Sequence, residues 1–172
     1  MSIQQLCLII VLAPLAGSLV AGLFRNQIGR IGAHSVTILG VTLSLIASLL
    51  VAKQVFSTGF VAENITLYHW ATGGMLLPYE FNLGFLIDPL TTVMLLIVNF
   101  VSLLVHIYSI GYMEDDDGYQ RFFSYISLFT FMMLMLVTSN NFLQLFFGWE
   151  GVGLVSYLLI GFWYQKESAL EG

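Results

Sequence analysis

The stretch from Phe142 to Tyr164 is long enough to cross a lipid bilayer, and its one carboxylate, Glu150, lies well inside it. A transmembrane helix needs about 20 largely apolar residues. At a rise of about 1.5 Å per residue, Glu150 lies roughly 12 Å from Phe142, in the middle third of a hydrocarbon core about 30 Å thick. A charge at that depth costs about 2.5–3.5 kcal/mol on the mildest insertion scales, so an intramembrane carboxylate is by default a functional residue.

The composition of the whole chain agrees with a membrane protein. Of its 172 residues, 58% are hydrophobic and only 9% are charged, whereas soluble domains have about 25% charged residues. The mean hydropathy is +0.90. The five basic residues are dispersed, so nucleic acid is not an expected partner. Cys7 is the single cysteine, which excludes a disulfide framework or a thiolate metal site within the chain.

Hydropathy predicts about five transmembrane helices. The expected helices are Ile3–Phe24, Ala33–Phe56, Pro89–Met113, Tyr119–Thr138 and Phe142–Tyr164, and the first two are joined by a loop over Arg25–Gly32. Pro14 should kink the first helix, and neighbouring helices are expected to satisfy the carbonyl that it frees. Asp88 followed by Pro89 is typical of a helix start. The Asp side chain caps the first turn, and the N–H that Pro lacks would have no partner at the first helical position.

Between the second and third helices, two segments alternate apolar and polar side chains. These are Asn64–Trp70 and Tyr79–Phe85, and Thr72-Gly73-Gly74 lies between them. Such a pattern predicts a β-hairpin packed on the membrane face. His69 lies within the hairpin without a partner carboxylate at metal-ligand spacing, so a structural role is expected for it.

The expected fold is therefore an all-α polytopic membrane protein with a short extramembrane β-hairpin between helices two and three. Residues 1–56 form the first two helices, 57–88 the extramembrane segment, 89–164 helices three to five, and 165–172 a polar tail. Four basic residues fall on one side of the membrane, namely Arg25, Arg30, Arg121 and Lys166, and Lys53 alone falls on the other. The positive-inside rule then places the N-terminus and the hairpin outside.

Two side chains are candidates for proton chemistry. At helical spacing, Glu150 is surrounded by apolar, aromatic and small residues: Leu143, Phe146, Phe147, Gly153, Leu154 and Tyr157. A carboxylate in that setting, toggled by a moving partner, suits a proton relay, and the alternative is a structural hydrogen bond to a neighbouring helix. His106, about five turns along helix three, is a possible relay; the alternative is an interfacial histidine capped by a backbone carbonyl. No cofactor or metal site is expected, and Glu114–Gly118 reads as a solvated turn because it lacks calcium-ligand spacing.

Several motifs resemble one known family. The runs are Phe147-Gly148-Trp149-Glu150-Gly151-Val152-Gly153-Leu154, Ser156–Tyr164, Ile87-Asp88-Pro89-Leu90-Thr91, His106–Met113 and Tyr119-Gln120-Arg121-Phe122-Phe123. Together they resemble the L subunit of bacterial complex I, the mitochondrial ND5-type chain. The resemblance covers nearly the whole chain, and it identifies the sequence as the N-terminal portion of an antiporter-like subunit.

The resemblance implies a membrane-arm subunit of proton-pumping NADH:quinone oxidoreductase, in which Glu150 pairs with a lysine on a later broken helix. It implies no redox cofactor in this chain; NADH, FMN, iron–sulfur clusters and quinone are expected in other subunits. The expected partners are the other membrane-arm subunits, chiefly the adjacent antiporter-like one, and the lipid bilayer. The expected location is the bacterial inner membrane, with the mitochondrial inner membrane as the alternative.

Two other functions remain open. One is the large subunit of a multi-subunit Na⁺/H⁺ antiporter, and the other is a truncated, non-catalytic membrane scaffold. Because the partner lysine and the broken helices of the family are not in this sequence, we expect the chain alone not to pump protons in liposomes. Uncoupler-sensitive transport that is lost on Glu150→Gln would contradict that expectation.

Overall fold

Five helices and a two-stranded hairpin make up the computed structural model, which describes residues 1–57, 59, 62–72 and 80–164. In chain order the elements are α1 (Ile3–Leu23), α2 (Arg25–Ser57), β1 (Glu63–Thr72), β2 (Glu80–Ile87), α3 (Pro89–Tyr112), α4 (Tyr119–Val137), α5 (Phe142–Ile160) and the 3₁₀ turn η1 (Gly161–Trp163). In the described chain, all five α-helices are long and apolar enough to span a membrane. The expected fold class is confirmed.

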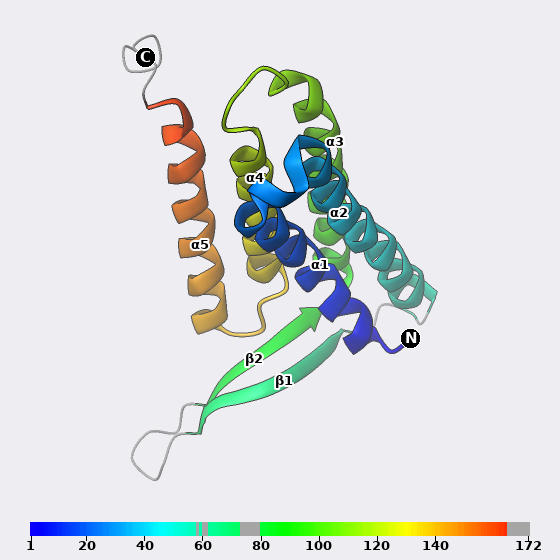
Figure 1. The fold of residues 1–172 in the computed structure, drawn as a ribbon. Coiled ribbons are helices and arrows are strands. Elements are labelled where there is room, and N and C mark those ends of the chain that lie inside the picture. The colour runs from blue at the N-terminus through cyan, green and yellow to red at the C-terminus, as the bar shows by residue number, and fades with distance from the viewer. Residues whose placement is uncertain (58, 60–61, 73–79, 165–172) are drawn as a thin grey trace.

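The helices form a bundle, with the hairpin across one end. Figure 1 shows the N-terminus and the hairpin at the same end and η1 at the opposite end, as five consecutive spans require. Helix α5 lies at the edge of the bundle, where it packs against α4. The arrangement leaves one side of α5 without a neighbouring helix in the described chain.

The α1–α2 connection differs from the expected loop over Arg25–Gly32. Helix α2 begins at Arg25, and its first turn bonds back through the amides of Gln27 and Ile28 to the carbonyl of Phe24. After the bend at Phe24, the one non-helical residue inside α2 is Gly29, whose φ of 63° lies in the left-handed region that favours glycine. The loop prediction was wrong because a single glycine suffices to redirect the chain between two helical segments.

Pro14 leaves the carbonyl of Ile10 without its helical donor, and a neighbouring helix supplies one. The hydroxyl of Ser44 on α2 donates to that carbonyl at 2.7 Å, and Ser127 on α4 donates to the carbonyl of Pro14 at 2.7 Å. The expected repair of the proline break is therefore confirmed. Close packing of α1 follows from small residues: a Cβ on Gly17 would lie 3.2 Å from the Cα of Thr37.

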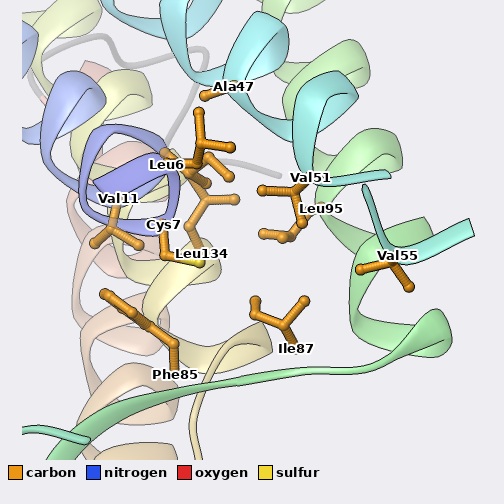
Figure 2. Close-up of a cluster of buried hydrophobic side chains, with 11 residues drawn as sticks. Leu6, Cys7, Val11, Ala47, Val51, Val55, Phe85, Ile87, Leu95 and Leu134 are labelled. Atoms are coloured by element: carbon orange, nitrogen blue, oxygen red, sulfur yellow. The ribbon is translucent and has the colours of Figure 1, made fainter. Parts of the chain in front are cut away.

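The largest buried apolar cluster lies at the end of the bundle that meets the hairpin. Figure 2 shows side chains from α1, α2, α3, α4 and β2 converging there, namely Leu6, Cys7, Val11, Ala47, Val51, Val55, Phe85, Ile87, Leu95 and Leu134. Cys7, the single cysteine of the sequence, is buried in this cluster. The end of β2 is thus part of the core, and the rest of the hairpin reaches away from the helices.

The hairpin is antiparallel, with Glu63 opposite Ile87 and Thr72 opposite Glu80. Strand β1 extends beyond the expected segment at both ends, and β2 does so at its C-terminal end. Register shifts between Thr66 and Tyr68 and between His69 and Ala71 interrupt the simple alternation. The turn expected at Gly73 and Gly74 and the tail over Gln165–Gly172 lie outside the described residues. Helix α5 ends at Ile160, short of the expected Tyr164, because the chain tightens into η1.

Candidate functional site

Helix α5 carries Glu150, and its orientation is set by its packing against α4 and the hairpin. Asn141 caps the helix by accepting from the amide of Gln144 at 2.9 Å. The buried face of α5 consists of Gln144, Gly148, Gly151 and Val155. A Cβ on Gly148 would lie 2.8 Å from the backbone of Leu136, so glycine is what permits this close approach of α4 and α5.

Glu150 lies on the opposite, exposed side of α5. Its apolar neighbours on that side are large and exposed: Phe146, Phe147, Leu154 and Tyr157 have exposed fractions of 55%, 52%, 60% and 73%. Gly153 lies among them, and a Cβ added to it would meet no atom within 4 Å. Within the described chain, Glu150 makes no hydrogen bond or ion pair. The candidate carboxylate therefore faces outward, in the centre of an uncovered apolar surface.

Polar contacts tie the start of α5 to the hairpin. The side-chain oxygen of Gln144 accepts from the amide of Gly84 at 3.0 Å, and Asn141 donates through Nδ2 to the carbonyl of Asn82 at 2.6 Å. The amide of Leu86 donates to the carbonyl of Thr138 at 2.9 Å. The position of Glu150 along the membrane normal is thus linked to the hairpin.

The other end of α5 is held by the α3–α4 turn. Asp116 accepts from the indole Nε1 of Trp163 at 2.7 Å and from the amide of Gly118 at 2.7 Å. Arg30 donates to the backbone carbonyls of Glu114 and Asp116. The acidic turn therefore joins α2 and η1, a role that the sequence pattern did not reveal because these residues are far apart along the chain.

His106 is completely buried on α3. Its Nδ1 donates to the carbonyl of Ser102 at 2.8 Å, and its ring lies 6.1 Å from that of Phe123. The expected alternative of a histidine bonded to a backbone carbonyl matches this contact, although the side chain is interior and not interfacial. Helix α4 packs against both α3 and α5, and the bonds of His106 run to α3. The structure does not bring His106 and Glu150 together, and a relay between them stays a prediction.

Two further polar contacts were not anticipated from the sequence. His34 Nδ1 lies 2.9 Å from the hydroxyl of Tyr119, and Arg30 lies 5.6 Å from the centre of the same ring. Within the described ranges, no group of three or more His, Cys, Asp or Glu residues is placed to hold a metal ion.

Comparison with known proteins finds two family models that match separate stretches of the chain. Residues 72–123 match the family model described as NADH-ubiquinone oxidoreductase (complex I), chain 5 N-terminus, and residues 139–172 match NADH:quinone oxidoreductase/Mrp antiporter, TM. NADH-quinone oxidoreductase subunit L of Neisseria meningitidis serogroup A is 58% identical over 170 residues, which are 98% of this chain and 25% of the relative. The chain belongs to the complex I subunit L family.

More distant members of the subunit L family match over the same region. Subunit L of Rickettsia conorii is 48% identical over 169 residues, which are 98% of this chain and 25% of the relative. NADH-ubiquinone oxidoreductase chain 5 of Arabidopsis thaliana is 49% identical over 162 residues, which are 94% of this chain and 24% of the relative. The chain spans about a quarter of the length of these relatives. With its five apolar helices, it is a multi-pass membrane protein.

Proposed function

We propose that this chain contributes to proton translocation in a membrane-arm subunit of proton-pumping NADH:quinone oxidoreductase, with Glu150 as an intramembrane proton carrier and charge switch. Similarity to subunit L over 98% of the chain supports the assignment to this enzyme. The single observation that carries the role of Glu150 is its outward position on α5, without a hydrogen bond or ion pair among the described residues.

The position of Glu150 is unfavourable for a purely structural residue. It lies eight residues after Phe142, about 12 Å along a helix whose exposed face is otherwise apolar. A carboxylate that met only lipid at this depth would cost about 2.5–3.5 kcal/mol if charged. We therefore propose that a helix outside this sequence covers the outer face of α5 and brings a cationic partner, a lysine, to Glu150.

A partner that approaches or retreats changes the protonation of such a carboxylate. A nearby cation favours the charged form of the carboxylate. When the cation withdraws, the carboxylate is left in a desolvated setting that favours its neutral form. Gly153 leaves space beside the carboxylate for that partner or for water. The redox chemistry belongs to other subunits in this proposal, since NADH, FMN, iron–sulfur clusters and quinone are expected there.

The proposed location is the bacterial inner membrane, with the N-terminus and the hairpin on the periplasmic side. The end of the bundle that holds Arg25, Arg30 and Arg121 then faces the cytoplasm. The outer face of α5 and the other subunits of the membrane arm, chiefly an adjacent antiporter-like subunit, are the proposed contacts of the chain.

Glu150→Gln in the assembled complex that contains this chain tests the proposal. Membrane vesicles are assayed for NADH oxidation and, in parallel, for uncoupler-sensitive proton uptake. The variant should assemble normally and lose proton uptake per NADH oxidised, because glutamine keeps the shape of the side chain but cannot carry the charge. Glu114→Gln, in the exposed α3–α4 turn, is the matched control and should leave proton uptake unchanged.

Other outcomes of the same assay identify the alternatives. Unchanged proton uptake in the Glu150→Gln complex would contradict the proposed role and favour a scaffold. Sodium-driven proton exchange that needs no NADH would favour the large subunit of a Na⁺/H⁺ antiporter.

A further inference from the structure

A line of polar side chains runs through the interior where α2, α3 and α4 meet. Its members, which we call the polar seam, are Ser44, Ser48, Asn99, Ser102, His106 and Thr130. All are buried except Ser102, which is partly buried. Buried polar groups in proteins are hydrogen-bonded with few exceptions, so the donors and acceptors of the seam can be counted one by one.

The part of the seam next to α2 uses every hydrogen that it has. Ser44 donates to the carbonyl of Ile10 at 2.7 Å, and Ser48 donates to the carbonyl of Ser44 at 2.9 Å. The two amide hydrogens of Asn99 go to Ser48 Oγ at 3.0 Å and to the carbonyl of Leu95 at 2.9 Å. Turning the amide end for end would set Oδ1 against that carbonyl, so the orientation of Asn99 is determined by its partners.

The part of the seam next to α4 is equally complete in its donors. Thr130 donates to the carbonyl of Ile126 at 2.9 Å, so Ser102, at 2.6 Å from Thr130 Oγ1, must donate to that hydroxyl. His106 Nδ1 lies 2.8 Å from the carbonyl of Ser102 and must carry a hydrogen. In the neutral ring, Nε2 is then an acceptor.

Two acceptors remain after this count. Asn99 Oδ1 and His106 Nε2 are buried and have no hydrogen-bond partner among the described residues, although every seam donor is used. A buried acceptor left without a donor has lost its hydration without replacement, which destabilises the fold. Protonation of His106 would not cure the deficit, because Nε2–H would lack an acceptor and Asn99 Oδ1 would be unchanged. The seam needs hydrogen donors from outside the described residues.

We propose that the polar seam is a water-binding site, in which one molecule donates to His106 Nε2 and a second donates to Asn99 Oδ1. Water is the smallest donor, and buried water in proteins characteristically satisfies such groups. The two residues are seven positions apart on α3, about 10.5 Å along the axis, so one molecule cannot serve both. This water site lies among α2, α3 and α4 and is independent of the role proposed for Glu150.

A cavity adjoins the His106 side chain. This cavity of about 420 Å³ lies between α3 and α4 and is lined by His106, Ser102 and Thr130 together with Met94, Met133 and other apolar residues. A water molecule occupies about 30 Å³ in the liquid. Because Nε2 itself is covered in this conformation, water reaches it when a cavity side chain shifts, and the unbranched methionines change rotamer readily. A lipid chain in the cavity would leave both acceptors unsatisfied, since hydrocarbon donates no hydrogen.

A cryo-EM map of the assembled complex, at a resolution that shows other buried water molecules, tests the proposal without any substitution. The expected result is density at hydrogen-bonding distance, about 2.7–3.2 Å, from both His106 Nε2 and Asn99 Oδ1. Absence of density at either atom, in a map that shows water elsewhere in the helix interiors, would overturn the proposal. So would acyl-chain density that fills the cavity against His106.

Two variants then check that each molecule belongs to its own acceptor. His106→Phe should lose the density beside residue 106 and keep the density beside Asn99, and Asn99→Leu should do the reverse. Density that survives the loss of its acceptor would mean that other groups hold the water, which would contradict the proposed contacts.

Discussion

Two glycines of α5 allow the packing of the helix against α4 to be measured by one chemical change. A Cβ added at Gly148 would lie 2.8 Å from both Cα and N of Leu136, whereas a Cβ added at Gly153 would meet no atom within 4 Å. Because the obstacle at Gly148 is the backbone of α4, it cannot turn aside as a flexible side chain would. Gly148→Ala must push the two helices apart, and Gly153→Ala must not.

The magnitude follows from comparing the two variants. Replacing glycine with alanine inside a helix stabilises by about 1 kcal/mol through propensity, and this term is common to both. Overpacking costs about 1–3 kcal/mol and applies to Gly148 alone. The free energy of unfolding of Gly148→Ala should therefore be lower than that of Gly153→Ala by about 1–3 kcal/mol, the propensity term having cancelled.

Equilibrium unfolding of the chain in mixed detergent micelles, titrated with sodium dodecyl sulfate and followed by circular dichroism, measures the difference. Gly153→Ala should be at least as stable as the parent chain. Equal stabilities of Gly148→Ala and Gly153→Ala would refute the close approach of α4 and α5, and with it the orientation that points Glu150 outward.

Two substitutions probe the contacts at the ends of α5. Gln144→Leu removes the acceptor of the buried Gly84 amide and should lower the free energy of unfolding by about 1–3 kcal/mol. Hydrogen exchange at the Gly84 amide should become faster. Unchanged exchange there would contradict the contact. Asp116→Ala removes the acceptor of Trp163 Nε1 and of the Gly118 amide and should lower the free energy of unfolding by about 1–3 kcal/mol. The tryptophan emission should shift as well. The control Asp115→Ala, at an exposed neighbour, should change neither quantity.

The amino-acid sequence was enough to predict the number of transmembrane helices, the cap of α3 and the break at Pro14. Long apolar runs can form only helices in a bilayer, because every backbone group must be satisfied within the segment. Asp88 caps α3 through a side-chain bond to the amide of Thr91 at 2.6 Å, as the Asp-Pro pair indicated. The repair of the Pro14 break was also foreseeable, although its donor Ser44 was not, because 34 positions separate it from Ile10.

Which side of each helix is buried could not be predicted from the pattern. Helix α5 is apolar on all sides, so periodicity does not distinguish Gly148 and Gly151, which meet α4, from Gly153, which meets nothing. Similarly, the sequence marks His106 and Asn99 only as polar residues in an apolar helix, and their lack of donors appears only once α2, α3 and α4 surround them.

The sequence alone therefore determined the membrane class, the five spans, the hairpin and the position of Glu150 along α5, since these depend on local composition and spacing. Tertiary structure decided that Glu150 faces outward while His106 is enclosed, that the end of β2 enters the core, and that the acidic turn holds the end of α5. These features depend on contacts between residues far apart in the chain, and in a bilayer such contacts are chosen by close packing and hydrogen bonding more than by hydrophobicity.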